Sequence, residues 1–303
     1  MISGDISGLD WYQMSNRGVR DLFRRTLSSP PENAPMDSST VAAASEALRN
    51  LPMPSEGARE YIAKHIPRLS RTIALVPKPF KTKRTLELGC YMQITPLLAR
   101  IAGYEEVRGG YFGRPGRIDH KVIQFPDGEF QCYVDHFDAE RDRYPYPDGQ
   151  FDLVVATEIF EHLIYNPMHL LLESRRVLTE GGYILLSTPN SAGLACVLKA
   201  LQGKRTPQVY AHFKIPDDEP EVGHRREYTL AELGQSVQAA GFRIEKLFTT
   251  VIDEYEGKWR DTVLEILGAN GFPTEQRGEQ SWCLARKDST LPIEPYPSSI
   301  FGP

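Results

Sequence analysis

The sequence contains no apolar run of membrane-spanning length, and its N-terminus lacks the basic-then-apolar pattern of a secretion signal. Cysteine is scarce as well, since only Cys90, Cys132, Cys196 and Cys283 occur and no two of them form a CxxC pair. Four scattered cysteines are typical of reduced structural thiols rather than of a disulfide framework. These absences favour a cytoplasmic protein that makes no contact with a membrane.

A basic excess is also missing, because the formal net charge of the 303 residues is −5. General nucleic-acid binding needs a positive surface, so this charge balance argues against it while leaving room for a local basic patch. Apolar residues are well represented, with 41% hydrophobic and 25% charged residues. This composition predicts one large domain, or one domain with an extension, around a sizeable core.

Residues 151–190 are the most strongly patterned part of the chain. Residues 151–156 form a short Val-rich apolar run, which is typical of a strand buried on both faces. Pro167 then opens a segment with helical spacing, Gly181 and Gly182 are expected to stop that helix, and residues 183–187 form a second buried run. The order of these elements predicts a βαβ unit.

Three ionisable side chains follow the first of these strands directly. Glu158, Glu161 and His162 lie in the segment TEIFEHL at residues 157–163. In an open parallel sheet, ligands bind beyond the carboxyl ends of the strands. We therefore expect these side chains to line a functional site.

Several segments together resemble the Rossmann-like, class I methyltransferases that use S-adenosylmethionine (SAM). More narrowly, they look like bacterial methyltransferases often associated with glycan or secondary-metabolite pathways, over roughly residues 59–287. Jointly the motifs are specific, although any one of them alone is weak. The segments are YPDGQFDLV at 146–154, EHL at 161–163, RVL at 176–178 with Gly181 and Gly182, STPN at 187–190, HRREYT at 224–229 and AGF at 240–242.

The resemblance implies an α/β fold, the Rossmann-like methyltransferase fold, with a central and mostly parallel sheet, helices on both faces and an N-terminal helical extension. We expect the methyltransferase domain at residues 55–290, with an insertion at 193–228, between an N-terminal extension at 1–54 and an extended, Pro-rich tail at 291–303. The extension is either a lid over the substrate site or a surface arm or oligomer contact. The insertion is either a cover for the substrate or a tolerated surface loop.

Local patterns place further elements on this frame. Helices are expected at 11–23, 41–51, 55–76, 95–102, 193–201, 230–240 and 259–267, and strands at 83–90, 107–112, 131–137, 242–248 and 281–286. Thr229 is expected to cap the helix that follows it, and Gly241 to end that helix.

The cofactor SAM is expected at the carboxyl ends of several strands, as the resemblance implies. The expected cofactor-binding residues are Glu87, Gly89, Cys90 and Tyr91 at the first strand, Asp138 and Ala139 at the third, and Thr157 at the fourth. Asp138 and the next backbone N–H match the positions that recognise the adenine edge in similar enzymes. The alternatives are an ordinary strand-to-helix turn at Gly89 and a plain turn cap at Asp138.

Two features depart from the family pattern. Tyr91 and Gln93 stand where further glycines are common, so only Gly89 can take a positive φ without cost. The second strand runs into GYFG at residues 110–113, without the carboxylate that usually binds the ribose hydroxyls. The ribose would then be held by backbone, by an aromatic face or by Asp119 from an unusual loop.

The candidate catalytic residues are His162, Glu158, Glu161 and the later His224. If the turn at residues 158–162 is helical, the first three share one face. The near-neutral reference pKa of histidine suits His162 to the role of general base. The alternative is that Glu161 and His162 brace nearby backbone, while His224 bonds Glu227 within its own turn.

The same four side chains, two carboxylates and two imidazoles, would suit a divalent metal such as Mg²⁺, Mn²⁺ or Zn²⁺. Whether a metal is used is left open by the sequence. A metal site requires that all four sets of ligand atoms can converge on one point.

Three functions fit these observations. The first is SAM-dependent O-methylation of a sugar, glycan or small-metabolite hydroxyl, with a small-molecule or glycan acceptor as the partner. The second is metal-assisted RNA 2′-O-methylation, because the four residues resemble that family's metal-binding set, although the acidic net charge counts against it. The third is a non-catalytic binding module on a methyltransferase fold.

Overall fold

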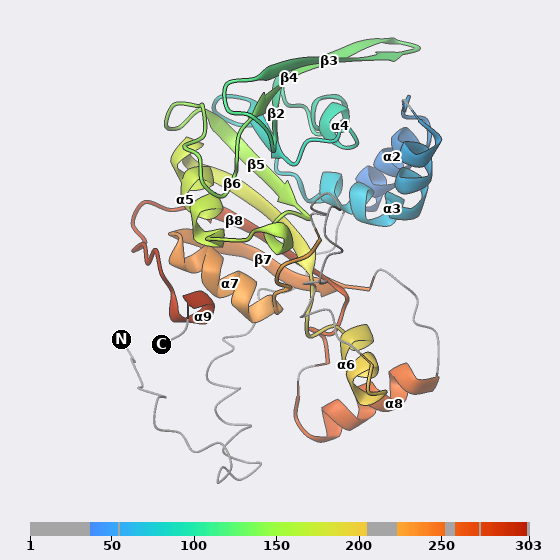
Figure 1. Ribbon diagram of the computed structural model, residues 1–303. Helices are drawn as coiled ribbons and strands as arrows, with labels where there is room; N and C mark the ends of the chain where they lie inside the picture. Colours follow the sequence, from blue (N-terminus) through green and yellow to red (C-terminus); the bar gives the residue numbers. More distant parts are fainter. Residues whose placement is uncertain (1–36, 54, 205–222, 252–257, 273, 302–303) are drawn as a thin grey trace, which may run out of the picture.

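The computed structural model describes residues 37–301, apart from residues 54, 205–222, 252–257 and 273. Helices cover both faces of an eight-stranded sheet in this part of the chain (Figure 1). The strands are β1 (Arg84–Leu88), β2 (Glu106–Tyr111), β3 (Ile118–Phe125), β4 (Gly128–His136), β5 (Phe151–Thr157), β6 (Leu178–Pro189), β7 (Phe242–Thr250) and β8 (Gln280–Lys287). The helices are α2 (Ser38–Arg49), α3 (Glu56–Leu75), α4 (Thr95–Arg100), the 3-10 turn η1 (Phe160–His162), α5 (Pro167–Val177), α6 (Leu194–Leu201), α7 (Leu230–Ala239), α8 (Lys258–Ala269) and α9 (Ser298–Phe301).

The strand order is β3-β4-β2-β1-β5-β6-β8-β7. Strands β4, β2, β1, β5 and β6 are mutually parallel. Strand β3 pairs antiparallel with β4, and β8 pairs antiparallel with both of its neighbours, β6 and β7. The order reverses between β1 and β5, which makes the carboxyl ends of these two strands the switch point of the sheet. The expected Rossmann-like methyltransferase fold is thereby confirmed.

The side chains of β5 show why the sheet needs helices on both sides. Leu153 and Val155 pack into the core shared with α2, α3 and α4, while Val154 and Ala156 pack into the core shared with α5 and α7. All four are fully buried. A continuous apolar run is therefore the correct signature of this central strand.

The start of β5 is anchored by a buried carboxylate. Asp152 accepts hydrogen bonds from the backbone N–H groups of Phe80, Lys81, Thr82 and Lys83 at 2.8–3.1 Å. Burial raises the pKa of Asp152, but these bonds outweigh it, so the pKa lies below its usual range. The loop that leads into β1 is thus held against the amino end of the central strand.

Most of the predicted elements are confirmed, including the Thr229 cap of α7 with its reciprocal bond to Glu232. The prediction that Gly181 and Gly182 end a helix is wrong. The helix ends at Val177, and β6 runs through both glycines opposite a register shift in β5. Gly181 has a φ of +77°, and a Cβ on Gly182 would lie 2.9 Å from the Thr179 carbonyl oxygen, so both positions need glycine.

Two further corrections concern the edges of the fold. Residues 118–125 form β3, a strand that was not expected, so Asp119 lies in a strand and not in a loop. The tail is not extended throughout, because α9 forms at residues 298–301 and packs near α7. The expected helix at 11–23 and residues 205–222 of the insertion lie outside the described residues.

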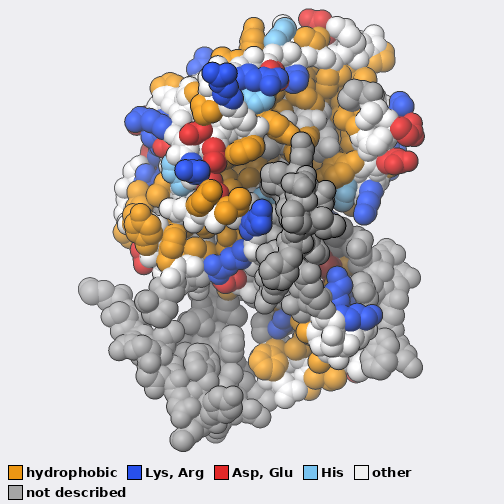
Figure 2. All heavy atoms as spheres, in the orientation of Figure 1, with side chains coloured by type: hydrophobic (Ala, Val, Ile, Leu, Met, Phe, Trp, Pro, Cys, Tyr) orange, Lys and Arg blue, Asp and Glu red, His pale blue; other side chains and the backbone are white. Residues whose placement is uncertain are grey.

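Lys and Arg side chains gather at the end of the molecule that carries β3 and β4 (Figures 1 and 2). There Arg108 pairs with Asp135 at 2.6 Å and Arg117 pairs with Asp119 at 2.9 Å. These ion pairs balance part of the positive charge within the fold. No helix in the described part of the chain is both long and apolar enough to cross a membrane.

Candidate active site

The carboxyl ends of β1 and β5 approach each other closely. A Cβ on Gly89, which has a φ of +65°, would lie 3.0 Å from Cδ1 of Ile159 in the turn after β5. Glycine therefore serves here both for its backbone angle and for the space it leaves. The predicted cofactor loop and the predicted catalytic turn are neighbours in the fold.

Glu158 is the first residue of this turn, and its backbone is strained. Its φ of +57° is unusual for a residue with a side chain. One oxygen of its carboxylate accepts hydrogen bonds from Ser187 Oγ at 2.8 Å and from the side-chain amide of Gln280. The prediction that one helical turn would align Glu158 with Glu161 and His162 is wrong, because only Phe160–His162 form the 3-10 turn and Glu158 precedes it.

Glu161 is almost completely buried, with 1% of its surface exposed. Oε2 accepts a hydrogen bond from Thr188 Oγ1 at 2.9 Å, whereas Oε1 has no hydrogen-bond partner among the described residues. Burial raises the pKa of Glu161 well above its usual range, and the nearby charge of Glu158 raises it further. Oε1 of Glu161 can therefore accept a proton or bind a ligand.

The later segment that carries His224 returns to this turn. The backbone N–H of Arg225 donates to the carbonyl oxygen of Glu161 at 2.7 Å, and Asn190 forms a parallel bridge with Tyr228. The His162 and His224 rings consequently meet edge to face, with centroids 4.9 Å apart. Two segments that are distant in the sequence thus form one site.

His224 is oriented by a buried carboxylate. Its Nδ1 lies 2.9 Å from Oε1 of Glu227, whose side chain is 4% exposed, while the His224 side chain is 30% exposed. The expected bond between His224 and Glu227 is therefore present, and it uses Nδ1 of the two ring nitrogens. The corresponding distance at His162 is longer, since its Nε2 lies 3.8 Å from Oε1 of Glu161.

The four-residue metal site considered from the sequence does not form, because only Glu161, His162 and His224 come together. One ligand atom from each of Glu161, His162 and His224 lies within 4.8 Å of the others. Glu158 is not in this group, since its carboxylate is directed to Ser187 and Gln280. The cluster offers one carboxylate and two imidazoles, a donor set that zinc and manganese accept.

The predicted cofactor residues at β1 combine a buried acid with an open aromatic side chain. Glu87 is 5% exposed, and its Oε2 has no hydrogen-bond partner in the described part of the chain. Tyr91 is 63% exposed, and its ring meets that of Tyr111 edge to face at 5.3 Å. Cys90 is buried against Thr95, with the two side chains 3.3 Å apart.

Aromatic rings lie at the end of β2, where the family pattern would place a ribose-binding carboxylate. Tyr111 ends β2 and lies 5.9 Å, ring to ring, from His136 at the end of β4. Asp119 reaches this area from β3 and lies 3.1 Å from His136 Nε2, but it is also paired with Arg117 at 2.9 Å. The rings of Tyr111 and His136 therefore lie where the aromatic-face alternative would hold the ribose.

Asp138 follows β4 at the expected position and is partly used by its own turn. Its Oδ1 accepts the backbone N–H of Glu140 at 2.9 Å, as the turn-cap alternative predicts. The Ala139 carbonyl accepts from the Tyr144 hydroxyl at 3.1 Å, and Thr157 ends β5 opposite Ser187. The adenine assignment stays a prediction, and Oδ2 of Asp138 is the carboxylate oxygen that the turn does not use.

Several neighbours of the two carboxylates were not predicted from the sequence. Thr188 and Gln280 hold the two carboxylates, and Arg68 on α3 lies close enough to Glu161 to oppose the rise of its pKa. Thr188 lies inside the STPN motif and could have been found there. Gln280 and Arg68 gave no such signal, because a strand terminus and a helix face show no local pattern.

Comparison with known proteins agrees with the geometry. A family model described as a methyltransferase domain matches residues 56–247. A protein of Mycolicibacterium smegmatis, described as a probable S-adenosylmethionine-dependent methyltransferase, is 33% identical over 101 residues. That match spans 33% of this chain and 32% of the relative, so it covers about a third of either protein.

Two solved structures show a weak likeness to the chain. A SAM-dependent methyltransferase from Mesorhizobium loti aligns with a TM-score of 0.45 at 16% identity, covering 74% of this chain and 98% of that one. One from Archaeoglobus fulgidus aligns with a TM-score of 0.46 at 17% identity, covering 75% and 94%. These values describe a partial likeness of fold and carry no information on the acceptor.

Proposed function

The chain belongs to the methyltransferase-domain family, as a Rossmann-like SAM-dependent methyltransferase, and on this premise we propose that it methylates a hydroxyl of a sugar, glycan or small metabolite. The observation that supports this most is the His224–Glu227 pair beside Glu161 at the carboxyl edge of the sheet. A hydroxyl must lose its proton when its oxygen is methylated, so the enzyme needs a positioned proton acceptor. An imidazole held by a buried carboxylate meets that need.

The residues at the ends of β1, β4 and β5 fit the cofactor. Glu87 presents a buried oxygen without a partner among the described residues, and Gly89 allows close approach of backbone. We assign Glu87, Gly89, Cys90, Tyr91, Asp138, Ala139 and Thr157 to SAM. When bound, SAM supplies a methyl group activated by a cationic sulfur.

The structure favours His224 over His162 as the base. If Nδ1–H of His224 donates to Glu227, the lone pair of the neutral ring is on Nε2, which can take the hydroxyl proton. Glu227 then stabilises the imidazolium that forms, as an orienting acid does in other base–acid pairs. Glu161 and His162 line the same space and position the acceptor.

Kinetics of matched variants test this assignment. His224→Gln should lower kcat by about 10²–10⁴-fold, the usual contribution of a general base, while the affinity for S-adenosylhomocysteine (SAH) stays unchanged. His162→Gln, which removes the adjacent ring, should have the smaller effect. The reverse ranking, measured as SAH release, would contradict the role given to His224.

A divalent ion is the second candidate for activating the hydroxyl. It is favoured by the convergence of Glu161, His162 and His224 and by the unpartnered Oε1 of Glu161. These three would hold the ion, which would lower the pKa of a bound hydroxyl. Activity that is lost on chelation and restored by Mn²⁺ or Zn²⁺ would support it, whereas full activity after chelation would leave His224 as the base.

The other functions have less support. RNA 2′-O-methylation would need a nucleic-acid surface, but the net charge is −5 and Glu158 does not join the other three side chains. A binding module without chemistry would not need an imidazole oriented beside a carboxyl group. We propose a cytoplasmic enzyme, since its four cysteines are free and buried, with a small-molecule or glycan acceptor and with neither nucleic acid nor membrane as its partner.

The insertion is proposed to cover the acceptor. Its helix α6 packs against α8 through Leu194, Leu198 and Val263, and the pair lies apart from the main helix layers (Figure 1). Asn190 fixes the beginning of the insertion by donating to the carbonyl oxygens of Gly278 and Gln276 at 2.7 and 3.0 Å. Both helices follow chain segments that leave the carboxyl edge of the sheet.

A further inference from the structure

Helix α3 carries two arginines whose guanidinium groups are poorly matched within the protein. Arg68 is 6% exposed and makes one hydrogen bond, from Nη2 to the Tyr61 hydroxyl at 2.9 Å. Arg71 makes one, from Nη1 to Thr250 Oγ1 at 3.3 Å, and its buried Nε has no partner among the described residues. Their i,i+3 spacing places both on the same side of the helix.

Both arginines lie at the edge of the sheet that carries the proposed active site. Burial and Glu158 raise the pKa of Glu161, and the positive charge of Arg68 opposes this rise. Thr250, the partner of Arg71, pairs with Gln280, whose side chain binds Glu158. Arg68 is thus close enough to act on the charge of Glu161, and Arg71 is linked to Glu158 through Thr250 and Gln280.

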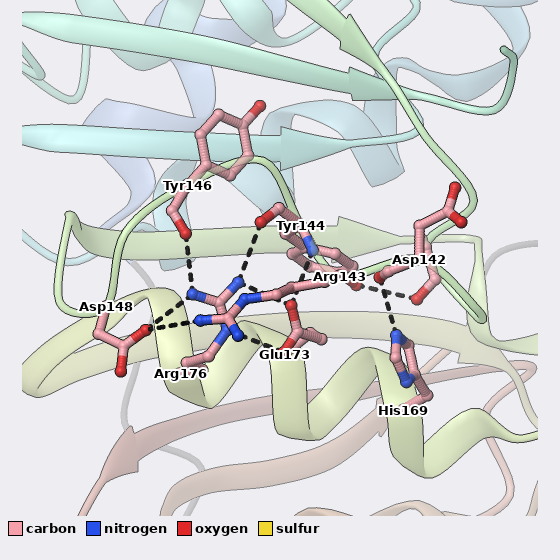
Figure 3. A network of polar contacts seen from close by, with 9 residues as sticks. Asp142, Arg143, Tyr144, Tyr146, Asp148, His169, Glu173 and Arg176 are labelled. Atoms are coloured by element: carbon pink, nitrogen blue, oxygen red, sulfur yellow. Dashed lines mark hydrogen bonds and ion pairs between the residues drawn. The ribbon is translucent and has the colours of Figure 1, made fainter. Parts of the chain in front are cut away.

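Arg176 on α5 shows what a fully matched arginine looks like in this protein (Figure 3). Its five N–H donors bind both oxygens of Glu173, Asp148 Oδ1 and the carbonyl oxygens of Tyr144 and Tyr146, all at 2.7–3.0 Å. Arg68 and Arg71 make one hydrogen bond each, and neither forms an ion pair with any described residue. Burying a guanidinium without an anion is costly, so an anionic partner is expected from beyond the described residues, and a bound acceptor can supply it.

The position of Arg71 separates this partner from the cofactor. Thr250 lies on β7, four strands from β1 in the sheet order, which is roughly 19 Å along the edge at about 4.8 Å per strand. The carboxylate of SAM is expected near the β1 loop. Tyr61 lies near this loop, because it acts on Tyr91 there. Burial and Tyr111 raise the pKa of Tyr91 to about 12, and Tyr61 adds to the rise.

Resting on the proposed function, we propose that the acceptor carries a carboxylate or phosphate group and that Arg71, with Arg68 beside it, binds this group. The planar fork of a guanidinium matches the paired oxygens of either anion. Binding there would hold the acceptor at one end and leave its hydroxyl beside His224 and Glu161. The acceptor is thus an acidic or phosphorylated hydroxyl compound.

Titration of inorganic phosphate into SAH-loaded protein tests the site directly. Native protein should bind phosphate, and Arg71→Gln should weaken that binding at least about tenfold, since a bidentate charged contact is lost. Arg59→Gln is the control, because Arg59 lies on the same helix with 60% of its side chain exposed. A parallel titration with acetate shows whether a carboxylate is preferred.

Several outcomes would overturn the proposal. No phosphate or acetate binding, or equal binding by native protein and Arg71→Gln, would remove the anion site. An SAH affinity that falls in Arg71→Gln as much as phosphate affinity would assign the arginine to the cofactor. Arg71→Lys, which keeps the charge and loses the fork, should lie between the two, and unchanged thermal unfolding should accompany each variant.

The anion site and the methylation of a hydroxyl can fail separately. Phosphate binding that depends on Arg71, without methylation of any hydroxyl, would retain the site and contradict the proposed function. Methylation of a hydroxyl without phosphate or acetate binding would retain the proposed function and contradict the anion site.

Discussion

The roles of His162 and His224 differ because each has a different neighbour. From the sequence, His162 is the expected general base and His224 is a further candidate catalytic residue. In the fold, Glu227 holds Nδ1 of His224 at 2.9 Å, whereas His162 and Glu161 are separated by 3.8 Å. The bond between His224 and Glu227 lies within one turn and was an alternative that the sequence offered, whereas the approach of His224 to His162 depends on where a distant segment meets the turn after β5.

Two other residues show the same limit. A helical turn would place Glu158 on one face with Glu161 and His162. Glu158 instead has a φ of +57°, and its side chain bonds Ser187 and Gln280. Asp138 was correctly placed beyond its strand, yet its turn uses one carboxylate oxygen. Sequence motifs therefore located these residues, while backbone angles and local bonds determined what their atoms do.

Glu161→Gln should reduce activity and increase stability. Its folded-state pKa is raised by burial and by Glu158, so the folded state loses stability as the pH rises from the usual glutamate range towards the raised pKa. A glutamine has no charge to bury, and the variant should therefore unfold at higher denaturant concentration than native protein at pH 7. Urea unfolding at pH 5 and pH 8 measures the change.

The activity of this variant should respond in the opposite direction. Native kcat/KM should rise with pH along a limb above the usual glutamate range, and Glu161→Gln should lack that limb. Glu56→Gln, at a position where the side chain is 76% exposed, is the control for both measurements. A native pH profile that is unchanged in Glu161→Gln would show that the carboxyl group takes no part.

At the scale of elements, the loop between β4 and β5 depends on one arginine of α5. Arg176 joins the carbonyl oxygens of Tyr144 and Tyr146 to Glu173, and His169 lies 2.9 Å from the carbonyl oxygen of Asp142 (Figure 3). This loop follows Asp138, the proposed adenine residue. Its position is thus tied to the helix that follows the catalytic turn.

Replacing Arg176 with Met should destabilise the protein by about 2–4 kcal/mol, because charged hydrogen bonds are lost and Glu173 is left partly buried without its partner. Arg175→Met is the matched control, since the bonds of Arg175 to Gly241 and Asp288 carbonyl oxygens are long, at 3.4 and 3.5 Å. Chemical denaturation compares the two. Equal losses would mean that the network adds nothing beyond the packing of the side-chain stem.

Apolar patterning predicted the elements that are buried and missed the one that is not. The continuous run of β5 and the helical spacing of α5 gave clear signals, because both elements pack into the core. The residues of β3 are mostly exposed or half-buried, so no alternation marked the strand. Its pairing with β4 depends on backbone hydrogen bonds, which any sequence offers.

At the scale of the whole molecule, the site is assembled from segments that the topology brings to one edge. The reversal of strand order between β1 and β5 opens the cofactor region, and the return of the chain at residue 224 adds His224 and Glu227. Helix α3 adds Arg68 and Arg71 from the N-terminal side. The family resemblance predicted the cofactor region and His224, whereas no pattern in the sequence pointed to Arg68 and Arg71.

The location of the transferred methyl group tests the central claim most directly. Native enzyme would be incubated with SAM carrying a ¹³C-labelled methyl group and a panel of hydroxyl compounds with and without a carboxylate or phosphate, and the products would be examined by NMR. The account predicts that the label appears on oxygen and that His224→Gln lowers its formation by about 10²-fold or more. Label on nitrogen or carbon, or no SAH from any acceptor although SAH itself binds, would contradict it.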